Sequence, residues 1–448
     1  NPPIASVSSL VTNDNIIITI KPTKIPARIQ IILARIDFVA GFSYNRAKPG
    51  FLSSTLTKSP LKNLPIFFNA VSNLGSFPFT ETNKLLKNNA VLCVAIVAAV
   101  ITAFIVPPDE KYLGYFDLST LYCLFGTLAV VEGLARIGFF EFLARKIVVK
   151  FKNLRAVTFA LVFITYFGSM VMANDMALIT FLPLGYYALE STGRKDKNAF
   201  VFVMQNVAAN LGGMLTPFGN PQNLYLYSYY KIPTDEFFYI MLAPFIAAFL
   251  LIFVCCFFVK PDPVTLATER ENKPDAFRSV AYLILFAVAV ASVMRLFPYY
   301  VGVSIAVAGV LILDFKSFAK VNYGLLLTFC AFFVFSGNMS RIDGVNRLID
   351  NLLNKNPLLV SILSCQVISN VPSATLLCKF TTNYAPLLRG VNVGGLGTPI
   401  SSLASLITIS EYKKRDGDFK KYALVYAAVN LSYLAVLIVV CLIFQPVG

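Results

Sequence analysis

The sequence predicts an all-α polytopic membrane protein, arranged as an inverted repeat with two re-entrant hairpins and two broken transmembrane helices. Three observations lead to this fold class. Only 14% of the 448 residues are charged and 57% are hydrophobic, whereas a soluble domain carries about 25% charged residues. Apolar runs close to the ~20 residues that span a bilayer recur along the chain. Matching polar motifs interrupt these runs in both halves of the chain.

The residue types exclude several kinds of chemistry. The chain has no His, so no imidazole can relay protons or bind a metal, and proton coupling would have to use carboxylates. Its eight Cys include no C-x-x-C pair and are interpreted as small buried apolar residues. The sequence contains no nucleophile–base set, metal-ligand cluster or Walker A motif. We therefore expect neither an enzyme nor an ATPase, and no cofactor or metal beyond a coupling ion.

Residues 1–88 differ from the rest of the chain. They hold ten Lys or Arg against three Asp or Glu, and they lack an apolar run of transmembrane length. The apolar stretches come too late and are too broken for a signal peptide. This segment is interpreted as a basic, poorly ordered N-terminal leader at the cytoplasmic surface rather than a nucleic-acid-binding arm. Truncation to about residue 85 is expected to leave function intact.

Beyond the leader, apolar segments fall at 89–107, 113–136, 156–190, 198–230, 236–259, 277–296, 299–314, 321–340, 357–390, 394–412 and 422–446. Segments 156–190 and 357–390 are long with polar centres, so each predicts two short spans or one re-entrant hairpin. Lys and Arg concentrate in the loops near 145, 195, 270 and 415, which predicts that these loops are cytoplasmic. The N-terminus of this plasma- or inner-membrane protein is then inside and its C-terminus outside. The two long segments enter from opposite faces.

An internal repeat explains why segments 156–190 and 357–390 are predicted to enter from opposite faces. The stretch GGMLTPFGNPQNL at 212–224 matches GGLGTPISSLASL at 394–406, and 173–184 resembles 369–380. Together with ARIG at 135–138 and SRID at 340–343, these are three matches in the same order, as a duplication would leave. We predict a first repeat at 89–259, a linker loop and extra transmembrane helix at 260–298, and a second repeat at 299–448. A single linking span inverts the second repeat, as in secondary transporters.

The repeated Gly-Gly-x-x-Thr-Pro motif predicts a break inside each membrane span. Pro217 and Pro221 each lack a backbone donor, and Gly212, Gly213 and Gly219 allow turns and close backbone contacts. The first broken helix should end near residue 214 and restart near 221. Free N–H groups at the restart suit an anion, and free carbonyls at the end suit Na⁺. A simple kink filled by a neighbouring helix is the alternative for either motif taken alone.

The motifs ANDMALITFLPL, TPFGNPQNL, SNVPSATLL and GTPISSLASL resemble the paired signatures of the ion transporter superfamily. This group includes citrate transporters, divalent anion/sodium symporters, arsenite permeases and sodium/proton antiporters. The resemblance covers about 89–446. It implies a homodimer in the lipid bilayer, with a scaffold and a moving transport domain, coupled to Na⁺ or H⁺ through an elevator motion.

The resemblance also implies site residues. Substrate binding is expected at Asn174, Thr216, Pro217, Asn223, Asn370, Ser373, Thr398 and Pro399, and cation binding at Asn174, Asp175, Gly219, Asn220, Ser369, Asn370, Ser401 and Ser402. Both hairpins lack the Thr of the family's Ser-Asn-Thr motif, because they read Ala-Asn-Asp and Ser-Asn-Val. The carboxylate of Asp175 would oppose a dicarboxylate unless it were protonated or cation-bound.

Four ionisable residues fall within the apolar segments, where such groups are costly and commonly functional. Asp314 and Glu411 lie near the ends of segments and are interpreted as interfacial. Glu132 is expected to pair with Arg136 one turn away. Asp175 is the main candidate for cation or proton coupling.

The expected function is secondary active transport of a small anion, either a di- or tricarboxylate or an inorganic oxyanion, with Na⁺ or H⁺ as the coupling ion. A sodium/proton antiporter is the alternative. An ion channel is less favoured, because paired inverted motifs are typical of transporters.

Overall fold

The computed structural model describes residues 90–264, 273–415 and 418–444, together with four short strands near the N-terminus. The chain divides into two compact units, Asn1–Asn88 and Asn89–Gly448. In the first unit, β1 (Val7–Thr12), β2 (Asn15–Ile20), β4 (Leu52–Leu56) and β3 (Phe42–Asn45) form an antiparallel sheet in that order. The sequence analysis did not anticipate these strands. The rest of the predicted leader lies outside the described residues.

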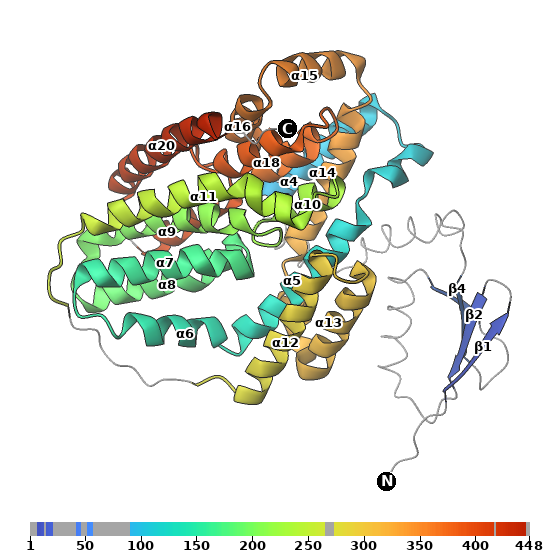
Figure 1. Cartoon of the computed structure of the whole chain (residues 1–448), viewed down its shortest axis with the longest axis horizontal. Coiled ribbons are helices and arrows are strands. Elements are labelled where there is room, and N and C mark those ends of the chain that lie inside the picture. Colours follow the sequence, from blue (N-terminus) through green and yellow to red (C-terminus); the bar gives the residue numbers. More distant parts are fainter. Residues whose placement is uncertain are drawn as a thin grey trace, which may run out of the picture. The chain divides into compact units, whose positions relative to one another are not determined.

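Every element that the structure names in the second unit is a helix (Figure 1). Its first half contains α4 (Ala90–Ile105), η3 (Glu110–Tyr115), α5 (Leu118–Arg136), α6 (Phe139–Val148), α7 (Leu154–Met172), α8 (Asn174–Ser191), η4 (Lys195–Lys197), α9 (Asn198–Gly212), η5 (Gly213–Leu215), α10 (Pro221–Tyr229) and α11 (Thr234–Phe257). Its second half contains α12 (Ala276–Val293), α13 (Tyr299–Asp314), η6 (Phe315–Lys320), α14 (Tyr323–Met339), α15 (Asp343–Lys355), α16 (Pro357–Ile368), α17 (Asn370–Leu377), α18 (Tyr384–Val393), α19 (Leu403–Arg415) and α20 (Phe419–Ile443).

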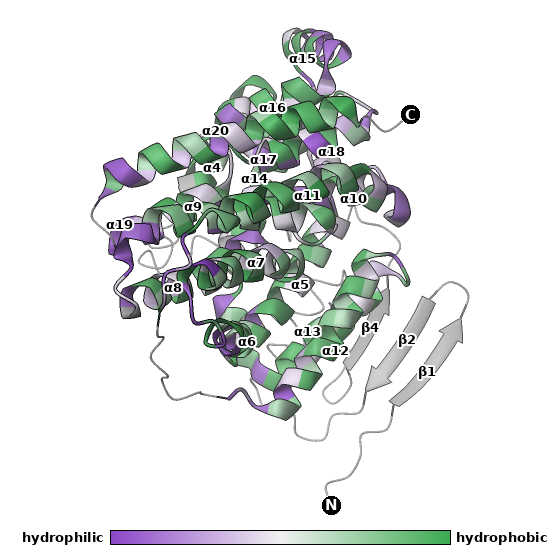
Figure 2. Ribbon diagram, turned by 60° about the vertical axis from the view of Figure 1, so that its left-hand side comes forward, coloured by the Kyte–Doolittle hydropathy of each residue, from purple (hydrophilic) through white to green (hydrophobic). Residues whose placement is uncertain are grey.

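Among the described residues, six helical segments are long and apolar enough to cross a membrane. They are α5, α7, α11, α12, the continuous stretch Tyr299–Lys320, and α20, and the bent pair α14–α15 is a seventh candidate. Figure 2 shows hydrophobic residues along most helices, whereas α19 is largely hydrophilic. The chain is thus an all-α polytopic membrane protein in this unit, as predicted.

Short polar side chains fix where several helices begin. Asp117 accepts from the Thr120 amide ahead of α5, and Asn153 accepts from the Ala156 amide ahead of α7. Asn356 does the same for α16, where Pro357 occupies the first helical position. These caps satisfy amide groups that a helix leaves unpaired, so each of these helices begins at the residue after its cap.

Helix packing follows a two-fold pattern between the halves. The contacts α4–α14, α9–α20 and α8–α19 are matched by α13–α5, α18–α11 and α17–α10. Each half also packs a hairpin, α7–α8 or α16–α17, against the first part of a broken helix, α9 or α18. Figure 1 shows α7 and α8 side by side beneath α9. Each of these contacts therefore recurs with the roles of the halves exchanged, as an inverted repeat requires.

The second half corrects two predicted boundaries. The segment 357–390 is not one hairpin, because the hairpin occupies 357–377 and the broken helix already begins at Tyr384. The second broken span is therefore 384–415 rather than 394–412. Short helices α6 and α15, which precede the two hairpins, were also not predicted as separate elements. Each carries apolar residues on one face and charged residues on the other, which is typical of a helix lying at an interface.

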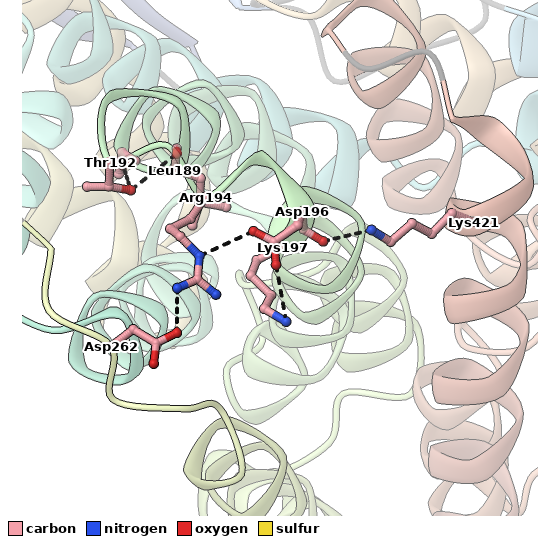
Figure 3. Close-up of polar contacts among 8 residues, drawn as sticks. Leu189, Thr192, Arg194, Asp196, Lys197, Asp262 and Lys421 are labelled. Carbon is pink, nitrogen blue, oxygen red and sulfur yellow. Dashed lines mark hydrogen bonds and ion pairs between the residues drawn. The ribbon is translucent and has the colours of Figure 1, made fainter.

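The basic loops lie on one side of this unit. Arg194 pairs with Asp262, and Lys421 donates to the backbone oxygen of Asp196 at 2.8 Å (Figure 3). The backbone of the α6–α7 loop pairs with the same segment, since Val264 N donates to Lys152 O at 3.0 Å. All four Lys/Arg-rich loops therefore meet. This arrangement agrees with the predicted common side, while the sidedness of each terminus remains a prediction.

Candidate functional site

The tips of the two hairpins have the same backbone geometry. Ala173 and Ser369, the last residues before α8 and α17, have positive φ angles of 65° and 76°. Each is followed by an Asn whose side-chain oxygen accepts from the next backbone amide at 2.9 Å, Asp175 N for Asn174 and Val371 N for Asn370. Non-glycine residues in this region of φ are strained, and such strain concentrates at functional sites. The matching motifs thus produce matching turns.

The broken helices also match. In the first, α9 ends at Gly212 and α10 begins at Pro221, which confirms the predicted break. In the second, α18 ends at Val393 and α19 begins at Leu403. The Thr of each Thr-Pro pair donates to the carbonyl three residues before the hairpin tip: Thr216 to Met170 O at 2.8 Å, and Thr398 to Gln366 O at 3.1 Å. Each break is therefore hydrogen-bonded to the hairpin of its own half.

Glycine is required where these breaks meet the hairpins. A β-carbon on Gly212 would lie 2.0 Å from the backbone oxygen of Tyr166 and 2.5 Å from Ser169 Oγ. One on Gly394, its counterpart, would lie 3.0 Å from Cys365 Sγ. The predicted close backbone approach at the Gly-Gly pair is therefore confirmed.

The two hairpin tips converge on one place. Asn174 Nδ2 lies 3.5 Å from Asn210 Oδ1. A β-carbon built on Gly395 would lie 3.5 Å from that same oxygen and 3.2 Å from Asn370 Nδ2. Asn174 and Asn370 are 4% and 3% exposed. The N-termini of α8 and α17 thus point their asparagines into a shared, buried polar centre between the halves.

Two asparagines that the sequence analysis missed connect this centre. Asn392 accepts from Asn220 Nδ2 at 3.2 Å and Gln222 Nε2 at 3.4 Å, and it donates to Asn223 Oδ1 at 2.6 Å. Asn210 accepts from Asn174, as described above. Both stand two residues before a Gly-Gly pair, in ANLGG and VNVGG. Extending the repeat by two residues upstream would have found them.

Several of the predicted site residues form hydrogen bonds to the unwound backbone at the breaks. Asn223 Nδ2 donates to the carbonyls of Gly213, Met214 and Thr216 at 3.1–3.2 Å. In the second half, Ser401 Oγ donates to Gly395 O and Thr398 O at 2.8 and 2.7 Å. Ser402 Oγ accepts from the amide of Ser405 and so caps α19. These contacts hold non-helical backbone that lipid could not accommodate.

The remaining predicted residues occupy distinct places. Ser369 Oγ donates to Ser401 O at 3.3 Å, which joins the second hairpin tip to the second break. Ser373 Oγ lies 2.8 Å from Ser364 Oγ, between the two legs of its hairpin. Pro217 is buried, whereas Pro399 is exposed. The structure therefore brings the two Asn and both breaks together, whereas Ser373 is buried within its own hairpin and Pro399 lies at the surface.

Oxygen atoms gather inside the first break. Asn220 Oδ1 is buried and has no hydrogen-bond donor in the described part of the chain. A β-carbon on Gly213 would lie 2.4 Å from that oxygen and 2.8 Å from Gly219 O. Side-chain and unwound backbone oxygens are the groups that coordinate Na⁺ in broken-helix transporters. The residues present fit a bound alkali cation.

Asp175 lies in the first turn of α8 and is 6% exposed. No Lys or Arg of the described residues lies within ion-pair distance of its carboxylate. The other candidates are placed differently: Arg136 Nε pairs with Asp314 at 3.2 Å, not with Glu132 as expected. Glu411 pairs with Lys414 at 2.7 Å and Arg415 at 3.2 Å near the end of α19. Asp175 thus directly follows Asn174 of the shared centre, and its backbone amide donates to the Asn174 side chain.

Each half of this unit supplies one hairpin and one broken helix, the halves form an inverted repeat, and buried amide side chains lie between them. This arrangement is that of a membrane transporter. The comparisons with known proteins agree, and the chain belongs to the citrate transporter family, whose profile matches residues 82–390. An uncharacterized transporter of Methanocaldococcus jannaschii is 30% identical over 73% of this chain and 90% of its own length. Inner membrane protein YbiR of Escherichia coli K12 is 29% identical over 75% of this chain and 90% of its own. A silicon efflux transporter of Oryza sativa subsp. japonica is 26% identical over 40% of this chain and 38% of its own.

Proposed function

We propose that this transporter moves a small anion by secondary active transport, coupled to Na⁺ or H⁺, through an elevator-type movement of the hairpins and broken helices. The observation that carries the proposal is the convergence of Asn174 and Asn370 on one buried centre. Four helices, α8, α10, α17 and α19, begin at the tips and breaks around it. Helix N-termini carry partial positive charge and free N–H groups, which favour an anion. The sequence contains no ATPase motif, so the energy would come from an ion gradient or from a partner ATPase, and we propose the gradient.

The coupling ion is proposed to bind at the first break, where Asn220 Oδ1 and the carbonyls of Gly213 and Gly219 gather. A bound cation there would offset the negative charge that Asp175 brings to the centre. Cation and anion would then stabilise each other's binding, which is the physical basis of symport.

A sodium/proton antiporter is the second candidate, and Asp175 is the observation that favours it. A buried carboxylate without a cationic partner can alternate between binding a proton and binding Na⁺. In this case, the coupling ion and the transported ion would compete at one carboxylate, and no anion would move.

The decisive experiment uses purified protein in proteoliposomes. For symport, labelled citrate, succinate or sulfate should accumulate only under an imposed Na⁺ or H⁺ gradient. For antiport, a Na⁺ gradient should drive protons across the membrane with no anion present. Asp175→Asn should abolish the antiport signal, but should mainly change apparent affinity in a symporter. The matched control is Glu132→Gln, which removes a membrane carboxylate outside the site. Anion flux that continues without any ion gradient would contradict both candidates.

A further inference from the structure

An apolar groove lies between α6 and α7 and is bordered by α5, α8 and α12. Its volume is about 570 Å³, which is within the range of small-molecule sites. All of its lining residues are apolar or glycine; they include Phe139, Leu143 and Ile147 of α6, and Phe159, Phe163 and Phe167 of α7. No residue of the asparagine centre lines the groove, so the transport site does not account for it.

The groove is open toward the surroundings of the helices. Leu143, Phe167 and Leu283, which all line it, are 46%, 48% and 42% exposed. Exposed apolar side chains of this kind on a membrane-spanning unit face lipid chains rather than water. A narrow apolar groove that opens sideways fits an extended hydrocarbon chain.

One edge of the groove is strongly basic. Residues 145–155 contain five Lys or Arg and no acidic residue. Lys146, Lys150 and Lys152 are exposed and lie next in sequence to the lining residues Ile147 and Phe151. No ion pair involves these three lysines within the described ranges. Arg155 is already engaged, because its Nε donates to Val259 O at 2.7 Å.

We propose that this groove binds an anionic glycerophospholipid, with an acyl chain between α6 and α7 and the headgroup phosphate on Lys146, Lys150 and Lys152. Lipid chains are as apolar as the groove, so moving an acyl chain from the bilayer into it yields little selectivity. The headgroup must therefore set the selectivity. A basic residue near an anionic membrane surface changes affinity by about fivefold, so three lysines give a clear preference over a zwitterionic lipid.

The absence of Trp from the chain permits a direct test that needs no transported substrate. The variant Leu283→Trp places one fluorophore in the groove, and Leu143→Trp, on α6, is a second reporter should the first fail to fold. The control is Leu250→Trp on α11, which is 55% exposed and lies outside the groove. Each protein is reconstituted into phosphatidylcholine vesicles containing either brominated phosphatidylglycerol or brominated phosphatidylcholine, and bromine quenching gives the relative affinity of the two lipids.

The expected result is at least a fivefold preference for phosphatidylglycerol at the groove reporters and a ratio near one at Leu250→Trp. Changing Lys146, Lys150 and Lys152 to Gln together should return the groove ratio toward one. The same change at Lys260, Lys273 and Lys420, which are also exposed, should leave it unchanged. Equal quenching by both lipids at the groove would overturn the proposal. The proposal would also be overturned if both brominated lipids quenched the groove reporters less than they quench Leu250→Trp, because the groove would then be closed or filled by protein.

Discussion

Replacement of Asn392 with Leu is the most direct perturbation of the asparagine network between the halves. Leu has a similar volume but no hydrogen-bonding group. The change removes the bonds from Asn220 and Gln222 and the bond to Asn223. Asn220 Nδ2 keeps a partner in Asn210 O at 3.3 Å. Gln222 Nε2 and Asn223 Oδ1 have no other partner in the described part of the chain, so the variant leaves two buried polar atoms unsatisfied.

The expected cost follows from these contacts. A hydrogen bond between membrane helices contributes about 0.6 kcal/mol on average and at most about 1.7 kcal/mol. Three such bonds therefore account for about 2 kcal/mol, and each stranded buried group adds about 1 kcal/mol or more. We expect Asn392→Leu to lower the free energy of unfolding by about 2–4 kcal/mol.

Asn430 provides the matched control. It is fully buried in α20, but its amide donates only to Tyr426 O one turn earlier, and its Oδ1 has no partner among the described residues. Asn430→Leu should therefore be neutral or stabilising. Both variants are compared with the wild type by the melting midpoint of the purified protein in one detergent, read from the loss of the monodisperse elution peak. If the melting midpoint of Asn392→Leu equals that of the wild type, or if both variants lower the midpoint equally, the network does not join the halves.

Two further predictions concern packing and charge. Gly212→Ala forces a β-carbon to 2.0 Å from Tyr166 O and should lower the free energy of unfolding by about 1–3 kcal/mol through overpacking. The control is Gly344→Ala in α15, where a β-carbon would have nothing within 4 Å, and it should be neutral or slightly stabilising. Equal melting midpoints for the two variants would refute the close contact at Gly212. The hydrogen bonds from Arg341 hold the pKa of Asp109 below its ordinary value. The stability from this pair is therefore present above the ordinary Asp pKa and is lost as pH falls through the lowered one. Arg341→Gln should lower the melting midpoint at pH 6, and this difference from the wild type should shrink as the pH is lowered into the acid range. A difference that is constant with pH would exclude this origin.

The sequence predicted much of the site because its signals act locally. Pro221 lacks a backbone donor and suits the first position of a helix, so it marks the restart of the first broken helix wherever the surrounding helices lie. Repetition of Gly-Gly-x-x-Thr-Pro then located the second break. The polar centres of the long segments located both hairpin tips at the correct residues, Asn174 and Asn370.

Predictions failed where neighbouring signals merged or partners were distant. The second hairpin and α18 form one apolar stretch, so hydropathy alone did not separate them at residues 378–383. Arg136 was matched with Glu132 because they are one turn apart, but it pairs with Asp314 on another helix. Local spacing cannot show which of two carboxylates the fold brings closer.

The sequence by itself determined the membrane class, the duplicated plan and the positions of the breaks, since proline, glycine and apolar length constrain the backbone residue by residue. Only the tertiary structure decided that Asn392 forms hydrogen bonds between the halves, that Asn210 lies beside both hairpin tips, and that α6 and α7 line an apolar groove beside three lysines. Hydrogen bonds between residues 169 to 172 positions apart depend on how helices pack. That packing minimises unsatisfied polar groups over the whole bundle, and no single stretch of chain encodes it.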